Sequence, residues 1–360
     1  DDALIGETGN TDTAYTQTSV TDGGVCLSAN TQYTVYVRAE NANGEGISSS
    51  TASAYTSANL PVSLSHELAS QTTAAMKWTW ASGGAQKDFY AYTVSPVANS
   101  GYITDLYWSQ SGLSANTQYT YYVKARNEES DLTGVVSSNG YTAQTTPTDI
   151  TFSSIATDSM VVGASGSFSN LATASSGVRF QNTTTSADNT LQTANWTNSS
   201  LNSNTEYTYV VSGVNGDGDE TSTITENKYT LINTPTDVNA SLATATTITV
   251  AAAGTFNNLA SDSSGLYFEN VTEGTNSGWV QTNIWEETGL SINTGYEYRV
   301  KARNSEGTET AFTGTSTLYT SQATPTAVTA VESDVDTLSV TATGSFANLT
   351  TGTAGLYFEN

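Results

Sequence analysis

Apolar and polar residues alternate along several short segments of this chain. Residues 118–126 and 247–253 are two such segments. A period of two is typical of a strand that buries one face. Turn-forming residues interrupt the alternation about every ten positions. The pattern therefore predicts an all-β protein built from short strands. In the first segment, the inward set consists of Tyr119, Tyr121, Val123 and Ala125.

The first segment belongs to a phrase that occurs four times. The copies are LSANTQYTVYVRAEN from Leu27, LSANTQYTYYVKARN from Leu113, LNSNTEYTYVVSGVN from Leu201 and LSINTGYEYRVKARN from Leu290. A repeat of roughly 90 residues is too long for a solenoid unit and has the size of a complete small β domain. We predict complete repeats at 60–145, 146–233 and 234–323, the C-terminal part of a repeat at 1–59 and the N-terminal part of a repeat at 324–360.

The shared pattern, Leu-x-x-Asn-Thr-x-Tyr-x-x-x-Val with a late asparagine, resembles the penultimate strand of fibronectin type III domains. This resemblance implies tandem immunoglobulin-like β-sandwiches in an extended array. It also implies a structural tyrosine corner, in which a hydroxyl bonds to nearby backbone. The Asn-Thr pair supplies turn chemistry before the strand. Because the tyrosines stand at inward positions, we interpret the phrase as scaffold. The corner residues would be Tyr33, Tyr119, Tyr207 and Tyr296.

The charge of the chain excludes several classes of partner. Lysine and arginine total 10 against 34 acidic residues, which gives a net charge of −24 over 360 residues. Phosphate binding requires a basic face, so neither nucleic acid nor an anionic membrane surface is expected to bind. No run of about 18 apolar residues is present, so we expect no membrane insertion in this segment. The single cysteine, Cys26, cannot form an intrachain disulfide.

Candidate chemistry is sparse. One histidine, His66, cannot by itself form a metal triad or a Ser–His arrangement. We therefore expect no enzyme activity and no cofactor, with calcium as the one candidate ligand. Calcium favours oxygen-rich loops, and VNGDGDET places Asp217, Asp219 and Glu220 close together. The alternative is a hairpin turn built on glycine and aspartate.

Two surface features remain open. Tryptophans shortly before three phrases predict a shared packing role, with an aromatic strip for sugars as the alternative; they are Trp108, Trp196 and Trp285. Six Asn-x-Ser/Thr sequons would carry glycans only in a secreted protein, and chance is the alternative in a chain so rich in these residues. The sequons begin at Asn182, Asn195, Asn198, Asn239, Asn270 and Asn348.

The first and last ranges hold complementary parts of one repeat. Either the sequence is a window on a longer array, or the last part of one molecule completes the first part of the next. The second arrangement would build a filament by head-to-tail self-association. We expect an extracellular structural protein at the cell surface, in a filament, a surface layer or an adhesin stalk. The alternatives are an array that binds a surface glycan or a protein, and an accessory region of a large secreted hydrolase.

Overall fold

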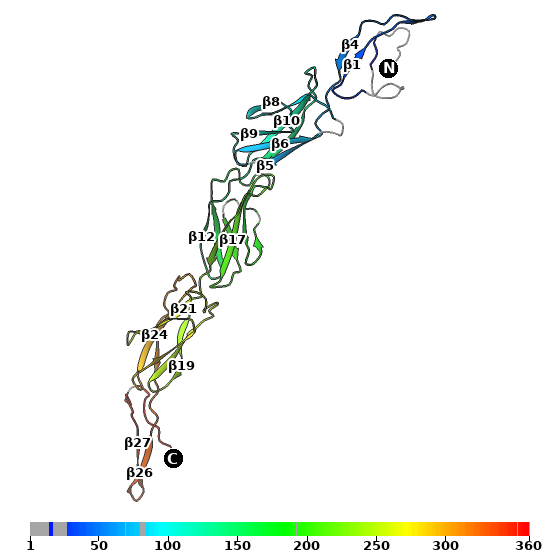
Figure 1. Ribbon diagram of the computed structural model, residues 1–360. Helices are drawn as coiled ribbons and strands as arrows, with labels where there is room; N and C mark the ends of the chain where they lie inside the picture. Colours follow the sequence, from blue (N-terminus) through cyan, green and yellow to red (C-terminus); the bar gives the residue numbers. More distant parts are fainter. Residues whose placement is uncertain are drawn as a thin grey trace. The chain divides into compact units, whose positions relative to one another are not determined.

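The computed structural model describes residues 14–16, 27–68, 70–79, 84–189, 191, 193, 195–350 and 352–359. The regular elements of these residues are strands (Figure 1), so the prediction of an all-β fold is confirmed. No helix in this part of the chain is long and apolar enough to cross a membrane. The predicted lone thiol, Cys26, lies outside the described residues.

Residues 60–145 form two antiparallel sheets from seven strands. The strand orders are β5-β6-β9 and β11-β10-β7-β8. In immunoglobulin domains of the constant type, the fourth strand joins the sheet of the first two strands. Here the fourth strand, β8, pairs with the third strand instead. The strands are β5 (Ser63–Leu68), β6 (Thr73–Thr79), β7 (Asp88–Val94), β8 (Val97–Ile103), β9 (Tyr107–Ser111), β10 (Gln118–Arg126) and β11 (Val136–Tyr141).

We number the repeats along the chain, so that residues 60–145 are the second repeat, 146–233 the third and 234–323 the fourth. The third repeat has the same topology, with sheet orders β12-β13-β16 and β15-β14-β17-β18. The fourth repeat has the orders β19-β20-β23 and β22-β21-β24-β25. The third repeat has β12 (Asp149–Ser153), β13 (Ser159–Ser165), β14 (Gly177–Asn182), β15 (Ala187–Asp188), β16 (Asn195–Ser199), β17 (Glu206–Val214) and β18 (Ile224–Tyr229). The fourth repeat has β19 (Asp237–Ala243), β20 (Thr247–Ala253), β21 (Gly265–Asn270), β22 (Thr275–Val280), β23 (Ile284–Thr288), β24 (Gly295–Arg303) and β25 (Ser316–Tyr319).

The ranges 1–59 and 324–360 hold shorter pairings. β1 pairs with β4, β2 with β3, and β26 with β27. Their bounds are β1 (Gln32–Val35), β2 (Glu40–Asn41), β3 (Gly44–Glu45), β4 (Ala52–Tyr55), β26 (Ala327–Asp334) and β27 (Thr337–Thr343).

By packing, the chain divides into two compact units whose limits do not coincide with the repeats. The first unit comprises Asp1–Pro147, Gly166–Arg179 and Ser212–Thr223. The second comprises Thr148–Ser165, Phe180–Val211 and Ile224–Asn360. Two regions of the third repeat, which include the beginning of β14 and the end of β17, therefore belong to the same unit as the second repeat.

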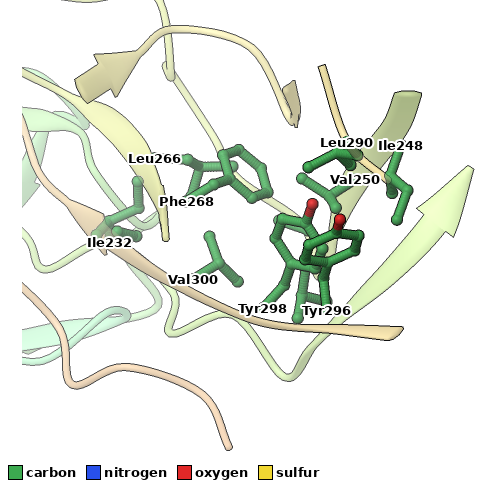
Figure 2. Packing of buried hydrophobic residues seen from close by; sticks show 12 residues of the cluster. Ile232, Ile248, Val250, Leu266, Phe268, Leu290, Tyr296, Tyr298 and Val300 are labelled. Carbon is green, nitrogen blue, oxygen red and sulfur yellow. The ribbon is translucent and has the colours of Figure 1, made fainter. Parts of the chain in front are cut away.

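The alternation observed in the sequence becomes the core of each sandwich. In the fourth repeat, Tyr298 and Val300 of β24 are fully buried, and Figure 2 shows the tyrosine ring directed toward Ile248 and Val250 of the opposite sheet. Burying a side chain of this size stabilises the fold by about 1.5–3 kcal/mol. In the second repeat, Trp78 of β6 is fully buried and packs on Phe89, with ring centroids 5.3 Å apart.

Each phrase tyrosine anchors the loop that precedes its strand. Its hydroxyl accepts a hydrogen bond from the backbone N–H five residues earlier, which is the contact that defines a tyrosine corner. The fold therefore uses Tyr207 and Tyr296, each 2 % exposed, as structural side chains. The four bonds are Ser28 N to Tyr33 (2.8 Å), Ser114 N to Tyr119 (3.0 Å), Asn202 N to Tyr207 (2.7 Å) and Ser291 N to Tyr296 (2.8 Å).

We predict that Tyr296→Phe destabilises the fourth repeat by about 1 kcal/mol, because it removes one hydrogen bond and leaves the Ser291 N–H without its acceptor. For a domain of this size, the calorimetric transition should fall by about 4–8 °C. Tyr319→Phe is the control, since that side chain is 61 % exposed. Equal melting temperatures for the two variants would contradict a stabilising corner.

Candidate functional site

The asparagine of the Asn-Thr pair in each phrase adopts a left-handed backbone conformation. Asparagine, like aspartate, tolerates positive φ better than most other residues that carry a side chain. Glycine would adopt this conformation as easily, but it would lack the amide. The recurrence of asparagine therefore indicates that the side chain has a task of its own. The φ angles are 49° at Asn30, 43° at Asn116, 48° at Asn204 and 44° at Asn293.

The Asn204 amide connects the third repeat to the fourth. Its Nδ2 donates to the carbonyl oxygens of Asn257 (2.8 Å) and Asn258 (3.1 Å). Its Oδ1 accepts a hydrogen bond of 2.8 Å from the backbone N–H of Ser305, in the loop after β24. Asn204 is fully buried, so this amide exchanges water for partners in the next repeat.

The next repeat returns the contact with an asparagine of its own. Asn258 also has a left-handed backbone, with φ of 48°. Its Nδ2 donates to the backbone oxygen of Asn204 and to Oγ1 of Thr205, each at 3.0 Å. Two left-handed asparagines thus bond reciprocally across the junction.

The same arrangement recurs at the other described junctions. Asn116 Nδ2 donates to the oxygens of Ser169 (2.7 Å) and Asn170 (3.1 Å), and Asn170 Nδ2 donates back to the Asn116 oxygen (2.9 Å). The Asn293 amide pairs in the same way with Asn348. In the first copy, Asn30 Oδ1 accepts from the Glu128 N–H at 2.8 Å.

The last asparagine of the phrase reaches in the opposite direction, toward the preceding repeat. It donates from Nδ2 to a backbone oxygen at the end of that repeat. One phrase therefore carries a forward and a backward contact, and we call the two residues together the asparagine connectors. The backward bonds join Asn127 to Thr56 (3.3 Å), Asn215 to Thr142 (3.4 Å) and Asn304 to Thr230 (3.1 Å).

Side chains just before each proline strengthen these junctions. Ile232 lies on the N-terminal side of the predicted boundary, yet it is 2 % exposed and packs in the core of the fourth repeat (Figure 2). Ala58 packs likewise in the core of the second repeat. At the corresponding position before the third repeat, Gln144 Nε2 donates to the Ser169 oxygen at 2.8 Å.

The predicted calcium residues take part in a junction and in local contacts instead of converging. Asp217 Oδ2 accepts the Tyr141 N–H at 2.6 Å, and Glu306 accepts the Tyr229 N–H at the next junction. Asp219 accepts from Asn215, and Glu220 pairs with Arg179 at 2.5 Å. The described residues contain no group of three or more His, Cys, Asp or Glu side chains that could hold a metal ion. Calcium binding stays a prediction, which melting with calcium and then with chelator would test.

Three of the six sequon asparagines are buried in the fold. Asn182, Asn198 and Asn270 are buried, and their amides bond within the sandwich. The amide of a fourth, Asn348, is committed to its junction. Glycosylation stays a prediction for the two remaining exposed residues, Asn195 and Asn239.

The recurring tryptophans pack rather than form an open strip. Each is half-buried and meets a core tyrosine edge to face. Trp108 and Trp285 also contact the hydrophobic clusters of their repeats. The pairs are Trp108 with Tyr121, Trp196 with Tyr209 and Trp285 with Tyr298, at centroid distances of 6.4, 6.1 and 6.2 Å.

A buried carboxylate in the fourth repeat was not apparent from the sequence. Glu287 is 7 % exposed and accepts hydrogen bonds from Asn270 (2.9 Å), Tyr298 and Thr275. Burial, followed by the hydrogen bond to Glu287, raises the pKa of Tyr298. Three donors satisfy the carboxylate, and the corresponding residue of the third repeat is Asn198. The arrangement is that of a structural polar network.

No protein-family model matches the chain. Exoglucanase B of Cellulomonas fimi is 27% identical over 274 residues, which are 71% of this chain and 25% of that protein. The chain thus spans a quarter of the relative. A two-domain fibronectin type III segment of chicken tenascin is 19% identical and is matched over its full length and 48% of this chain, with a TM-score of 0.31. The FN1-FN3 domains of chicken CNTN1 are 15% identical, with 99% of their length and 74% of this chain covered and a TM-score of 0.25.

Each of the three repeats described above is a β-sandwich of a three-stranded and a four-stranded antiparallel sheet. In these repeats, the prominent recurring polar site is the junction formed by the asparagine connectors.

We predict that Asn204→Gly weakens the junction between the third and fourth repeats by about 1–3 kcal/mol, because buried partners lose their hydrogen bonds. Asn204→Ala should cost about 1 kcal/mol more, since alanine disfavours the left-handed conformation. Hydrogen exchange of the Ser305 amide measures the loss directly. Asn283→Ala, in an exposed loop, is the control. Unchanged protection of Ser305 in both Asn204 variants would contradict the connector.

His66 provides a pH-dependent prediction. It packs on Tyr121, and burial lowers its pKa below the ordinary 6.5, although Asp217 and Asp219 act in the opposite direction. His66 therefore binds a proton more readily in the unfolded chain than in the folded chain. As a result, the free energy of unfolding falls as pH decreases below about 6.5. His66→Phe should remove this component. Phenylalanine is the matched choice, because Phe152 makes the corresponding ring contact with Tyr209. Parallel stability curves between about pH 5 and 7 would contradict it.

Proposed function

We propose that this chain is a non-catalytic structural array of an extracellular protein, which holds the segments on either side of it at a defined separation. The observation that carries the proposal is the recurrence of the asparagine connectors at successive junctions. A flexible string of domains needs only an unstructured linker and has no use for buried amides between neighbours.

The physical basis is the cost of opening a junction. An isolated hydrogen bond contributes about 0.5–1.5 kcal/mol, and a buried group left without its partner costs about 1–3 kcal/mol. The connector between the third and fourth repeats makes several such bonds at once, so bending that separates Asn204 from Asn258 is opposed by more than one of them. In a linear repeat protein, such nearest-neighbour terms set both stability and stiffness.

The charge of the chain supports an exposed structural role. With a net charge of −24, neighbouring molecules repel one another and nonspecific clumping is discouraged. A filament, a surface layer and an adhesin stalk are each compatible settings for such an array at the cell surface.

The match to Exoglucanase B favours a second candidate role. That relative is four times longer than the matched stretch, so the similarity concerns a part of it. On this alternative, the chain is an accessory region of a large secreted hydrolase, and the array spaces a catalytic domain from other modules. Sequencing the gene on both sides of this segment decides between the two settings.

Self-association stays a separate prediction. The hairpin β26–β27 exposes Val331 and Leu338, at 64 % and 63 %. Sedimentation of the full chain over a range of concentrations measures it: a growing species supports head-to-tail assembly, and a monomer at all concentrations contradicts it.

The spacer function is tested by a distance distribution across one junction. Spin labels are attached at Thr185→Cys and Glu273→Cys in a Cys26→Ser background, both at exposed turns of neighbouring repeats. We expect a narrow distribution that broadens in Asn204→Gly and does not broaden in Asn283→Gly. An equally broad distribution in all three proteins would contradict a spacer with fixed junctions.

A further inference from the structure

A line of tyrosines crosses the outer face of one sheet in the second repeat. β7 and β10 turn Phe89, Ala91 and Val123 into the core. Their alternate residues face outward and, together with one residue of β8, form what we call the tyrosine face. It comprises Tyr90, Tyr92, Tyr102, Tyr122 and Lys124.

The rings of this face form a continuous ladder. Tyr122 lies 5.0 Å from Tyr92, Tyr92 lies 5.7 Å from Tyr90, and Tyr90 lies 5.3 Å from Tyr102, measured between ring centroids. Tyr102 is 49 % exposed and the other three are half-buried. Arg126 contacts the outermost ring, with its guanidinium 3.6 Å from the centre of Tyr102, and it donates from Nε and Nη2 to Asp88.

The polar groups of the face are left for a partner. No described residue makes a hydrogen bond to the hydroxyls of the four tyrosines. The Lys124 ammonium lies over Tyr90 (5.4 Å) and Tyr92 (5.7 Å), and no carboxylate of the described chain pairs with it. The surface therefore combines aromatic carbon with hydroxyl and ammonium donors.

The fold itself does not require these rings, because the third repeat builds the same sheet without them. Gln181 of β14 stands where the second repeat has Tyr92, and Val210 of β17 stands where it has Tyr122. The fourth repeat keeps a related cluster, in which Lys301 lies over Tyr267, Trp279 and Phe312. A role in packing alone would not explain why two repeats carry the aromatic residues and one does not.

Charge narrows the class of partner. A net charge of −24 repels polyanions. A purely apolar partner would leave each tyrosine hydroxyl without water or a hydrogen bond, at a cost of roughly 1–3 kcal/mol, and it would leave the ammonium unsolvated at a larger cost. A neutral polymer with apolar C–H faces and many hydroxyls avoids both the charge repulsion and the loss of hydrogen bonds.

We propose that the tyrosine face is a binding surface for a neutral, extended polysaccharide. Sugar rings contact the tyrosines through their C–H faces, and their hydroxyls bond to the phenol groups and to Lys124. The face is a sheet surface rather than a pocket, which suits a linear polymer. The related cluster of the fourth repeat is a second, separate face of the same kind. This inference goes beyond the spacer function and does not depend on it.

The test measures co-sedimentation of the full chain with cellulose, xylan and chitin, with heparin beads as the polyanion. We expect binding to at least one neutral polysaccharide and none to heparin. Tyr92→Gln with Tyr122→Val introduces the residues of the third repeat. This pair of changes should weaken binding about tenfold, since each aromatic contact contributes roughly 0.5–1.5 kcal/mol. Circular dichroism and calorimetry establish that the variant remains folded.

A second variant keeps the proposal falsifiable if the first one unfolds. Gln181→Tyr with Val210→Tyr places the ladder in the third repeat and should strengthen binding to the same polysaccharide. Ser109→Ala, at an exposed position of β9 in the other sheet of the second repeat, is the control and should bind normally. The proposal is overturned if no neutral polysaccharide binds, if folded Tyr92→Gln/Tyr122→Val binds equally well, or if the substitutions abolish self-association instead. Spin-label distances stay unchanged in these variants, which separates this result from the spacer test.

Discussion

The structure depends on a buried amide that has no unsatisfied atom. At the junction of the third and fourth repeats, Asn204 donates from Nδ2 to two backbone oxygens of the following repeat, and its Oδ1 accepts from the N–H and the hydroxyl of Ser305. Such a group is stabilising only while every partner stays in place, because a buried amide deprived of them costs more than the bonds contribute. Position and orientation of one sandwich are thereby tied to the loops of the next. The tyrosine corner serves the same end, since it fixes the loop from which this asparagine projects.

Left-handed backbone explains why the residue is asparagine and not another amide. A glutamine at this position would have to bear the cost of positive φ, and its longer side chain would place the amide elsewhere. The partner in the following repeat, Asn258, satisfies the same two requirements. One residue type therefore answers both the conformational and the hydrogen-bonding demand of the junction, on both sides of it.

Sequence patterns revealed the sandwiches but not how they are joined. Alternation and repeat length predicted the strands, and the inward tyrosines indeed form the cores and corners. The asparagine was interpreted as a local turn residue, because its partners lie more than 50 residues away and no periodicity connects them. The acidic loop suggested a cation for a similar reason. The close spacing of its carboxylates is visible in the sequence, but the hydrogen bond that Asp217 accepts comes from the Tyr141 N–H of another repeat. Contacts between domains leave little trace in a single sequence. The trace here is an asparagine that recurs in all four phrases although the fold of one domain does not require its amide.

Ile232 shows where one heritable unit ends and the next begins. It precedes the proline that marks the repeat in the sequence, yet its side chain completes the core beyond that proline. A duplication or recombination event with its breakpoint at the proline would deliver a sandwich with a hole in it, and it would leave the donor with a stranded apolar residue. A functional duplication must therefore include a few residues before the proline. The segment that can be copied intact is thus offset from the repeat that the sequence pattern delimits.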